Sequence, residues 1–222
     1  MAKFEYTKVF DLSHPVYNNC PQWETYENTD VRLEAKHPTH GFLAERIDIN
    51  SHCATHLDAP YHFIPHGISI DKMPADLFQG ECVIIDCTDI EPAHSIGLKE
   101  LEPHSGRIHE GSIVMTVTGW GEKRGFSNVW YHDYPYMSQE GANWLADKKI
   151  KGYCIDTLST GAHPKHLDNG IPHAILLGAD IWLLEDFVVP RELLKYETCQ
   201  LFCFPLHLQN FGASPTRAVA FV

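Results

Sequence analysis

The residues best suited to chemistry form a short run of histidines with one aspartate. The run has the pattern H-x3-H-x-D-x3-H, and its members are His52, His56, Asp58 and His62. On a helix, His52 and His56 would share a face while Asp58 would point away from it. Pro60 also prevents a helix from continuing through this region. In an extended chain all four positions have the same parity, so the spacing predicts a strand that enters a loop with its polar groups on one face.

Two imidazoles and a carboxylate form a nitrogen and oxygen ligand set that suits Zn²⁺ or Mn²⁺. Cys53 would point to the opposite side, which argues against a closed structural zinc site. Three protein ligands leave one position open for water, as in catalytic metal sites. The alternative is that these are ordinary surface or core histidines, but several buried imidazoles without partners would be costly. The pattern therefore predicts a metal centre at His52, His56 and Asp58.

The segment that leads into this run has the alternation of a strand. Leu43, Ile47 and Ile49 fall on one side, and polar residues that include His52 fall on the other, which predicts a half-buried strand over 43–52 that delivers His52. Other strands are predicted from Val, Ile, Phe and Thr content between Gly, Pro or Asp. Their ranges are Glu81–Cys87, Ser112–Thr118, Gly152–Asp156, Thr198–Phe204 and Arg217–Val222.

Helices are fewer than strands. One is predicted from about Ser138 to Lys148 with Ser138 as its N-cap, a short one after Pro172, and another from Pro190 to Leu194. Strands with occasional helices predict an α/β or α+β fold with a curved, barrel-like mixed sheet. No repeat, charge block or linker divides the sequence, so one domain is expected over residues 1–222.

Composition narrows the class of protein. The net charge of −12 argues against a nucleic-acid surface, and no apolar run approaches the ~20 residues of a membrane helix. The N-terminal residues lack the apolar region of a signal peptide. The seven cysteines are scattered without a CxxC pair, which suits thiols in a reducing compartment. We therefore expect a cytoplasmic protein that binds neither nucleic acid nor membrane.

The histidine run resembles the signature of the putative cyclase superfamily, which includes bacterial kynurenine formamidase and isatin hydrolase. The usual form is H-x-G-T-H-x-D-x-P-x-H, and this chain departs from it by Ala54 in place of glycine. The resemblance covers nearly the whole chain. Its other segments are Asp11–Ser13, Pro21–Trp23, Thr118–Trp120, Ile155–Thr157, and a late histidine and glutamate.

The resemblance implies roles for further residues. It implies that His173 binds a second metal ion and that Asp58 and Glu185 bridge both ions. The apolar run before Glu185 supports a buried position, where a carboxylate needs a partner. His62 is implied as the general acid and base, the alternative being a hydrogen-bond partner that orients a ligand. Trp23 is implied to line the substrate pocket, the alternative being ordinary packing. Phe63, Trp120 and Tyr131 are expected in the core.

The predicted function is hydrolysis of a C–N amide bond in a small aryl formamide by a metal-activated water. The first alternative is a cyclic amide hydrolase of the isatin hydrolase type, and the second is a non-catalytic protein that binds a metal or a small ligand. One or two Zn²⁺ ions are expected, or Mn²⁺, and the family implies a homodimer or homotetramer. The exact substrate, the metal and its number stay open.

Eight further histidines fall into two groups. The loop with His163 and His166 is expected to border the pocket and to influence substrate choice, because Leu158 stands where the family usually has proline. The others lie in polar or turn-like surroundings and are expected to be solvated. They are His37, His40, His94, His104, His109 and His132.

Overall fold

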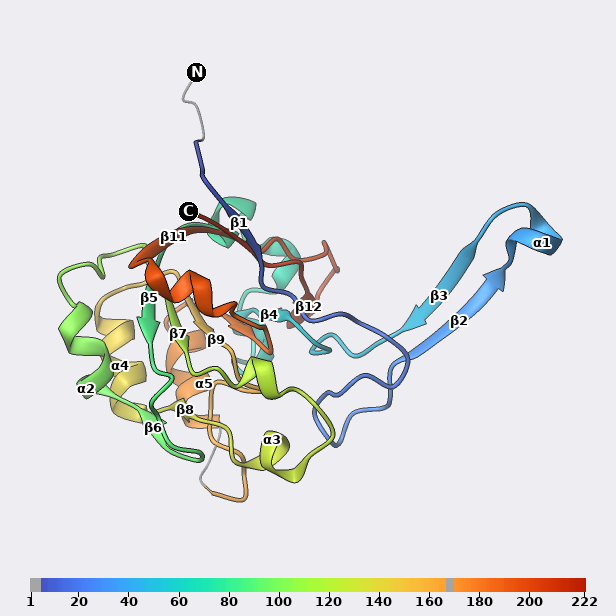
Figure 1. Cartoon of the computed structure of the whole chain (residues 1–222). Helices are drawn as coiled ribbons and strands as arrows, with labels where there is room; N and C mark the ends of the chain where they lie inside the picture. Colours follow the sequence, from blue (N-terminus) through green and yellow to red (C-terminus); the bar gives the residue numbers. More distant parts are fainter. Residues whose placement is uncertain (1–4, 167–169) are drawn as a thin grey trace.

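The computed structural model describes residues 5–166 and 170–222, and its centre is a nine-stranded mixed sheet (Figure 1). The sheet curls into a half-barrel, as the sequence predicted. In spatial order its strands are β1 (Val9–Asp11), β13 (Val219–Phe221), β11 (Thr198–Phe202), β5 (Gln79–Asp86), β7 (Ile113–Val117), β9 (Gly152–Ile155), β10 (Trp182–Glu185), β4 (His56–Asp58) and β12 (Ala213–Pro215).

The pairing of the strands decides where the site forms. β5, β7, β9 and β10 run parallel, and β4 pairs antiparallel with β10. The register places Glu185 opposite His56 and Leu183 opposite Asp58. Cross-strand neighbours of this kind lie close enough for direct side-chain contact. The strands β4 and β10, which are far apart in the sequence, therefore bring His56, Asp58 and Glu185 close together.

The two faces of the sheet contact different layers. Helices α2 (Leu98–Leu101), α4 (Gln139–Asp147) and α5 (Gly170–Gly178) lie together on one side, where Val83, Val114 and Leu183 are buried (Figure 1). Alternate strand residues such as Ile84 and Leu184 belong to a separate buried cluster. This alternation follows from the period of two in a strand. Further short elements include α3 (Asn128–His132), β6 (Ser95–Ile96) and β8 (Tyr136–Met137).

Most predicted elements are present, with ends shifted by one or two residues. The five predicted strands after the histidine run correspond to β5, β7, β9, β11 and β13. α4 begins after Ser138, whose hydroxyl accepts a hydrogen bond from the Gly141 N–H as an N-cap does. α5 starts at Gly170, just before Pro172, and the third predicted helix is a 3₁₀ helix over Arg191–Lys195.

The prediction for residues 43–52 is wrong. β3 (Ala44–Asp48) ends before His52, and it pairs with β2 (Asp30–Ala35) in a hairpin whose tip is α1 (His37–His40). The hairpin projects away from the sheet (Figure 1), and Ile47 is 56% exposed. The alternation correctly separates two faces, but no segment covers the apolar one within this chain as described.

Among the described residues, no helix has the length and apolarity needed to cross a bilayer.

Candidate metal centre

The histidine run passes through three conformations. His52 lies in a turn, His56 and Asp58 lie on β4, and His62 ends a 3₁₀ helix, η1 (Pro60–His62). The prediction of one extended segment therefore holds only for His56 and Asp58, which share a face of the strand. Pro60 begins η1, so the chain turns back and His62 Nε2 lies 3.9 Å from Asp58 Oδ2.

The three residues predicted to hold a first ion converge on one point. His52 Nδ1 lies 2.9 Å from Asp58 Oδ1, and His56 Nε2 lies 3.5 Å from the same oxygen. One ligand atom from each residue lies within 4.8 Å of the other two. The structure thus brings His52, His56 and Asp58 together as a possible metal-binding group.

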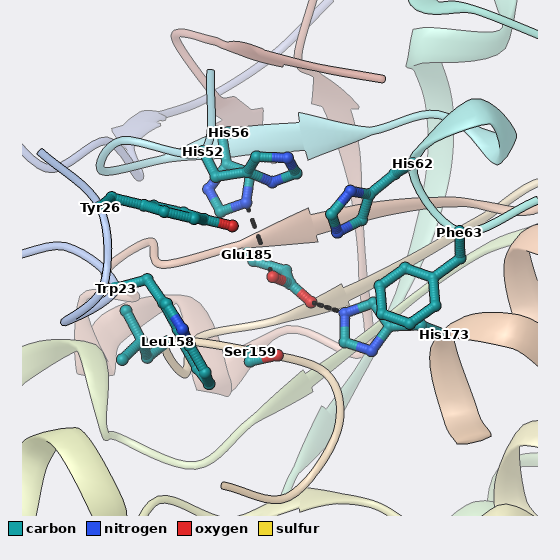
Figure 2. A pocket seen from close by; sticks show the side chains of 10 residues that line it. All are labelled: Trp23, Tyr26, His52, His56, His62, Phe63, Leu158, Ser159, His173 and Glu185. Carbon is teal, nitrogen blue, oxygen red and sulfur yellow. Dashed lines mark hydrogen bonds and ion pairs between the residues drawn. The ribbon is translucent and has the colours of Figure 1, made fainter. Parts of the chain in front are cut away.

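His173 and Glu185 join Asp58 in a second group of the same kind. His173, from α5, places Nε2 3.1 Å from Glu185 Oε1, and the Thr160 N–H donates to the same oxygen at 2.6 Å. All three side chains of the group are buried. Figure 2 shows the imidazoles and Glu185 facing one another across a single cavity.

The hydrogen bonding of His56 shows which of its ring nitrogens is left without a partner. Its Nδ1 lies 2.8 Å from the Ala54 carbonyl oxygen, which can only accept, so Nδ1 carries the proton and Nε2 presents a lone pair. That Nε2 faces the carboxylates of Asp58 at 3.5 Å and Glu185 at 3.6 Å. His56 Nε2 and both Asp58 oxygens are buried without a hydrogen-bond partner among the described residues. Buried acceptors that face one another fit a bound cation.

Ala54 occupies the place of the usual family glycine and adopts a φ of 54°. This left-handed conformation is the one that glycine adopts freely, and it costs another L-residue about 1–2 kcal/mol. The conformation presents the Ala54 carbonyl to His56 Nδ1. Ala54 therefore adopts a backbone shape open to glycine, and that shape orients His56.

Burial decides the protonation of the site. It lowers the pKa of His52 and of His62 to about 4, so both rings are neutral at pH 7. Burial raises the pKa of Asp58. Burial acts in the same sense on Glu185, but the hydrogen bond and charge of His173, the charge of His56 and the hydrogen bond from Thr160 together outweigh it and lower the pKa of Glu185 to about 2. Neutral imidazoles beside a carboxylate are the forms that bind a metal.

A cavity of about 160 Å³ opens onto these residues. Its lining is Trp23, Tyr26, His52, His56, His62, Phe63, Leu158, Ser159, His173 and Glu185 (Figure 2). Trp23 therefore borders the pocket, and so does Leu158 at the start of the loop that carries His163.

Two aromatic residues of the pocket wall were not predicted there from the sequence. Phe63 was expected in the core, but it lines the pocket and stacks on His173 at 4.6 Å and 14°. Tyr26 is brought to the wall by a turn in which its N–H donates to the Trp23 carbonyl at 3.0 Å. The spacing of three residues between Trp23 and Tyr26, which suits a turn, is the sequence feature that could have predicted this position. Trp120 is buried in an aromatic cluster, as expected.

A buried ion pair holds the Trp23 segment against the sheet. Arg124 Nε lies 3.1 and 3.0 Å from the two oxygens of Asp186, the residue after Glu185. The Arg124 side chain also donates to the Pro21 carbonyl. Only 6% of the Arg124 side chain and 3% of the Asp186 side chain are exposed. The pair therefore links the loop that carries Trp23 to the end of β10.

Replacing Arg124 by methionine is expected to lower the free energy of unfolding by about 3–5 kcal/mol, because Asp186 would stay buried without its partner. A raised KM with a smaller change in kcat should accompany this loss, since Trp23 would lose its support. Denaturant unfolding and steady-state kinetics measure both. The matched control is Arg191→Met, whose exposed side chain lies 3.5 Å from Glu122 and should matter little. Equal stability of the Arg124 variant and the parent would contradict the role of the pair.

Comparisons with known proteins find relatives that match nearly the whole chain. Residues 10–162 match the family described as "Putative cyclase". The kynurenine formamidase of Bacillus anthracis is 27% identical over 218 residues, which are 96% of this chain and 97% of that protein. Cyclase-like protein 1 of Arabidopsis thaliana is 26% identical, over 97% of this chain and 86% of that protein. The structure of isatin hydrolase A from Labrenzia aggregata superposes with a TM-score of 0.86 at 25% identity, over 97% of this chain and 93% of that one.

Proposed function

This chain belongs to the cyclase family, and from that membership we propose that it is a metal-dependent hydrolase that cleaves the C–N amide bond of a small aryl formamide. The observation that carries the proposal is the set of buried acceptors at His56 and Asp58, which lack hydrogen-bond partners among the described residues. Such a set is unfavourable without a cation and is suited to binding one.

We assign the ligands by their positions in the two groups. His52, His56 and Asp58 would hold one ion, and His173 would bind a second together with Asp58, the residue common to both groups. Glu185 belongs to the second group alone, and its proposed contact with both ions rests on the family resemblance. When bound, a divalent ion of this type lowers the pKa of water to about 7 and polarises a carbonyl group. The nitrogen and oxygen donors suit Zn²⁺ and also Mn²⁺.

We propose that His62 moves the proton. Its ring is neutral at pH 7, so Nε2 can accept a proton from the water that attacks the formyl carbon. Asp58 Oδ2, 3.9 Å away, stabilises the imidazolium that results. Nε2–H then donates that proton to the leaving nitrogen as the C–N bond breaks. The products are an aryl amine, formate and one proton released to solvent.

The shape and lining of the cavity favour an aromatic substrate. Its volume of about 160 Å³ is close to that of cavities of ~150 Å³ that admit benzene. Trp23, Tyr26 and Phe63 contribute flat apolar surfaces to the wall. We propose that Trp23 contacts the aryl group while the reacting amide faces the imidazoles.

A second candidate is opening of a cyclic amide. The likeness to isatin hydrolase A favours it, since the superposition covers nearly all of both chains. The same bond is cleaved and the same proton transfer is required, but the carboxylate and the amine stay on one molecule. The residues that would act are therefore unchanged.

Elemental analysis joined to a panel of aryl formamides and cyclic amides tests the function. We expect bound Zn²⁺ or Mn²⁺ and hydrolysis of one substrate class. Chelation should remove the activity while the protein stays folded by circular dichroism, and added metal should restore it. Loss of the fold on chelation, with no hydrolysis of either class, would instead indicate a structural metal site and overturn the proposal.

The cellular compartment and the oligomeric state of the enzyme are also proposals. All seven cysteines are buried and unpaired, which supports a reducing compartment such as the cytoplasm. The exposed apolar residues of the β2–β3 hairpin, among them Leu33 and Ile47, support a homodimer or homotetramer. Light scattering of the purified protein measures the oligomeric state directly.

A further inference from the structure

A third group of possible metal ligands lies beside the pocket and outside the proposed centre. Its members are Glu24, His132 and His163, hereafter the rim cluster. Glu24 lies in the turn between Trp23 and Tyr26, His132 ends α3, and His163 lies in the loop that follows β9. His132 was expected to be solvated, but only 20% of its side chain is exposed, and 16% of that of His163.

The separations in the rim cluster match those of a metal site. His132 Nε2 lies 2.9 Å from Glu24 Oε2, and His163 Nε2 lies 3.7 Å from the same oxygen. Tetrahedral zinc with bonds of ~2.0–2.1 Å separates its ligands by about 3.3 Å. At the proposed centre the corresponding distances from Asp58 Oδ1 are 2.9 and 3.5 Å. The carboxylate–imidazole distances in the two groups therefore differ by no more than 0.2 Å.

Hydrogen bonding explains only part of this arrangement. A bond from His132 Nε2 to Glu24 accounts for the 2.9 Å contact, but 3.7 Å is too long for a second bond from His163. The two imidazole rings pack with centroids 4.5 Å apart, and both direct Nε2 toward the same carboxylate oxygen of Glu24. Two imidazole nitrogens and one carboxylate oxygen form a donor set that divalent ions of the zinc class prefer.

We propose that the rim cluster binds a divalent transition-metal ion of the zinc class, separate from the catalytic centre. The bound ion would join the Trp23–Tyr26 turn, α3 and the loop after β9. Two of these segments contribute pocket residues, and the Trp23 ring lies 5.7 Å from the His163 ring. Ion binding therefore stiffens the mouth of the pocket. His163 Nδ1 accepts from the Lys165 N–H at 3.2 Å, so binding at Nε2 moves the ring proton to Nδ1 and breaks that contact.

Equilibrium dialysis against micromolar free Zn²⁺ tests the proposal. The wild-type chain is expected to bind one ion more than the His132→Ala/His163→Ala double variant. The control is His109→Ala, which removes an exposed imidazole elsewhere and should bind as the wild type does. Because the readout is a difference between variants, it does not depend on how many ions the catalytic centre holds. Equal stoichiometry in the wild type and the double variant would overturn the proposal.

A milder variant covers the case in which the double variant folds poorly. Glu24→Gln keeps the size of the side chain and removes its charge, and should weaken binding of this ion at least about tenfold. Zn²⁺ should also raise the melting temperature of the wild type more than that of Glu24→Gln, since an ion that binds the folded state stabilises it. Identical affinity and identical thermal shifts in the two proteins would refute the site.

Discussion

Replacing Asp58 with asparagine is expected to abolish hydrolysis and to remove bound metal without weakening the apo fold. Asp58 belongs to both ligand groups of the centre, so its charge would serve both ions. The stabilisation that a metal supplies to the transition state is several kcal/mol, so turnover should fall at least about a thousandfold. The apo protein should be no less stable, because the lost charge is a fully buried one without a hydrogen bond among the described residues.

Asp156 provides the matched control for this experiment. It is also a buried aspartate at the end of a central strand, but its carboxylate accepts from Thr118 N–H, Thr118 Oγ1–H and Gly119 N–H at 2.6–2.7 Å. Asp156→Asn should therefore lower the free energy of unfolding by about 1–3 kcal/mol and retain the metal. Metal content, kcat and denaturant unfolding of both variants give the comparison. An Asp58→Asn protein that keeps its metal and its turnover would remove Asp58 from the centre.

The residues that could bind a metal were easier to predict from the sequence than the strand pairing that brings them together. His56 and Asp58 are two residues apart, so any strand places them on one face, and β4 does so. The convergence of Glu185 with them depends on the register of β10 against β4. That register is a long-range property, and no local pattern encodes it. For His173 and Glu185 the family resemblance supplied what periodicity could not.

The errors of the sequence analysis share one physical cause. Alternation in residues 43–52 shows that a strand has two unlike faces, but it cannot show whether another segment covers the apolar face. Phe63 and His132 were misplaced in opposite directions for the same reason. Phe63 stacks on His173 in the pocket, and His132 meets Glu24 instead of solvent. In each case the deciding neighbour is distant in the sequence.

His62→Ala is expected to retain the metal of the wild type and to lower kcat by about 10²–10⁴-fold, the usual contribution of a positioned acid and base. His62 is the member of the histidine run that lies farthest from Asp58, at 3.9 Å, and 24% of its side chain is exposed to the pocket. It belongs to neither ligand group of the centre. Metal analysis and steady-state kinetics on the same preparation measure both expectations.

The competing role for His62 predicts a different result. A residue that only orients a metal ligand would lower metal affinity about 10–100-fold when removed, and excess metal would then restore the rate. Added imidazole should restore part of the rate only if a proton carrier is missing. His66→Asn is the control, since His66 is exposed in the same loop and its φ of 67° suits asparagine. Full turnover in His62→Ala, or recovery by metal alone, would rule out proton transfer by His62.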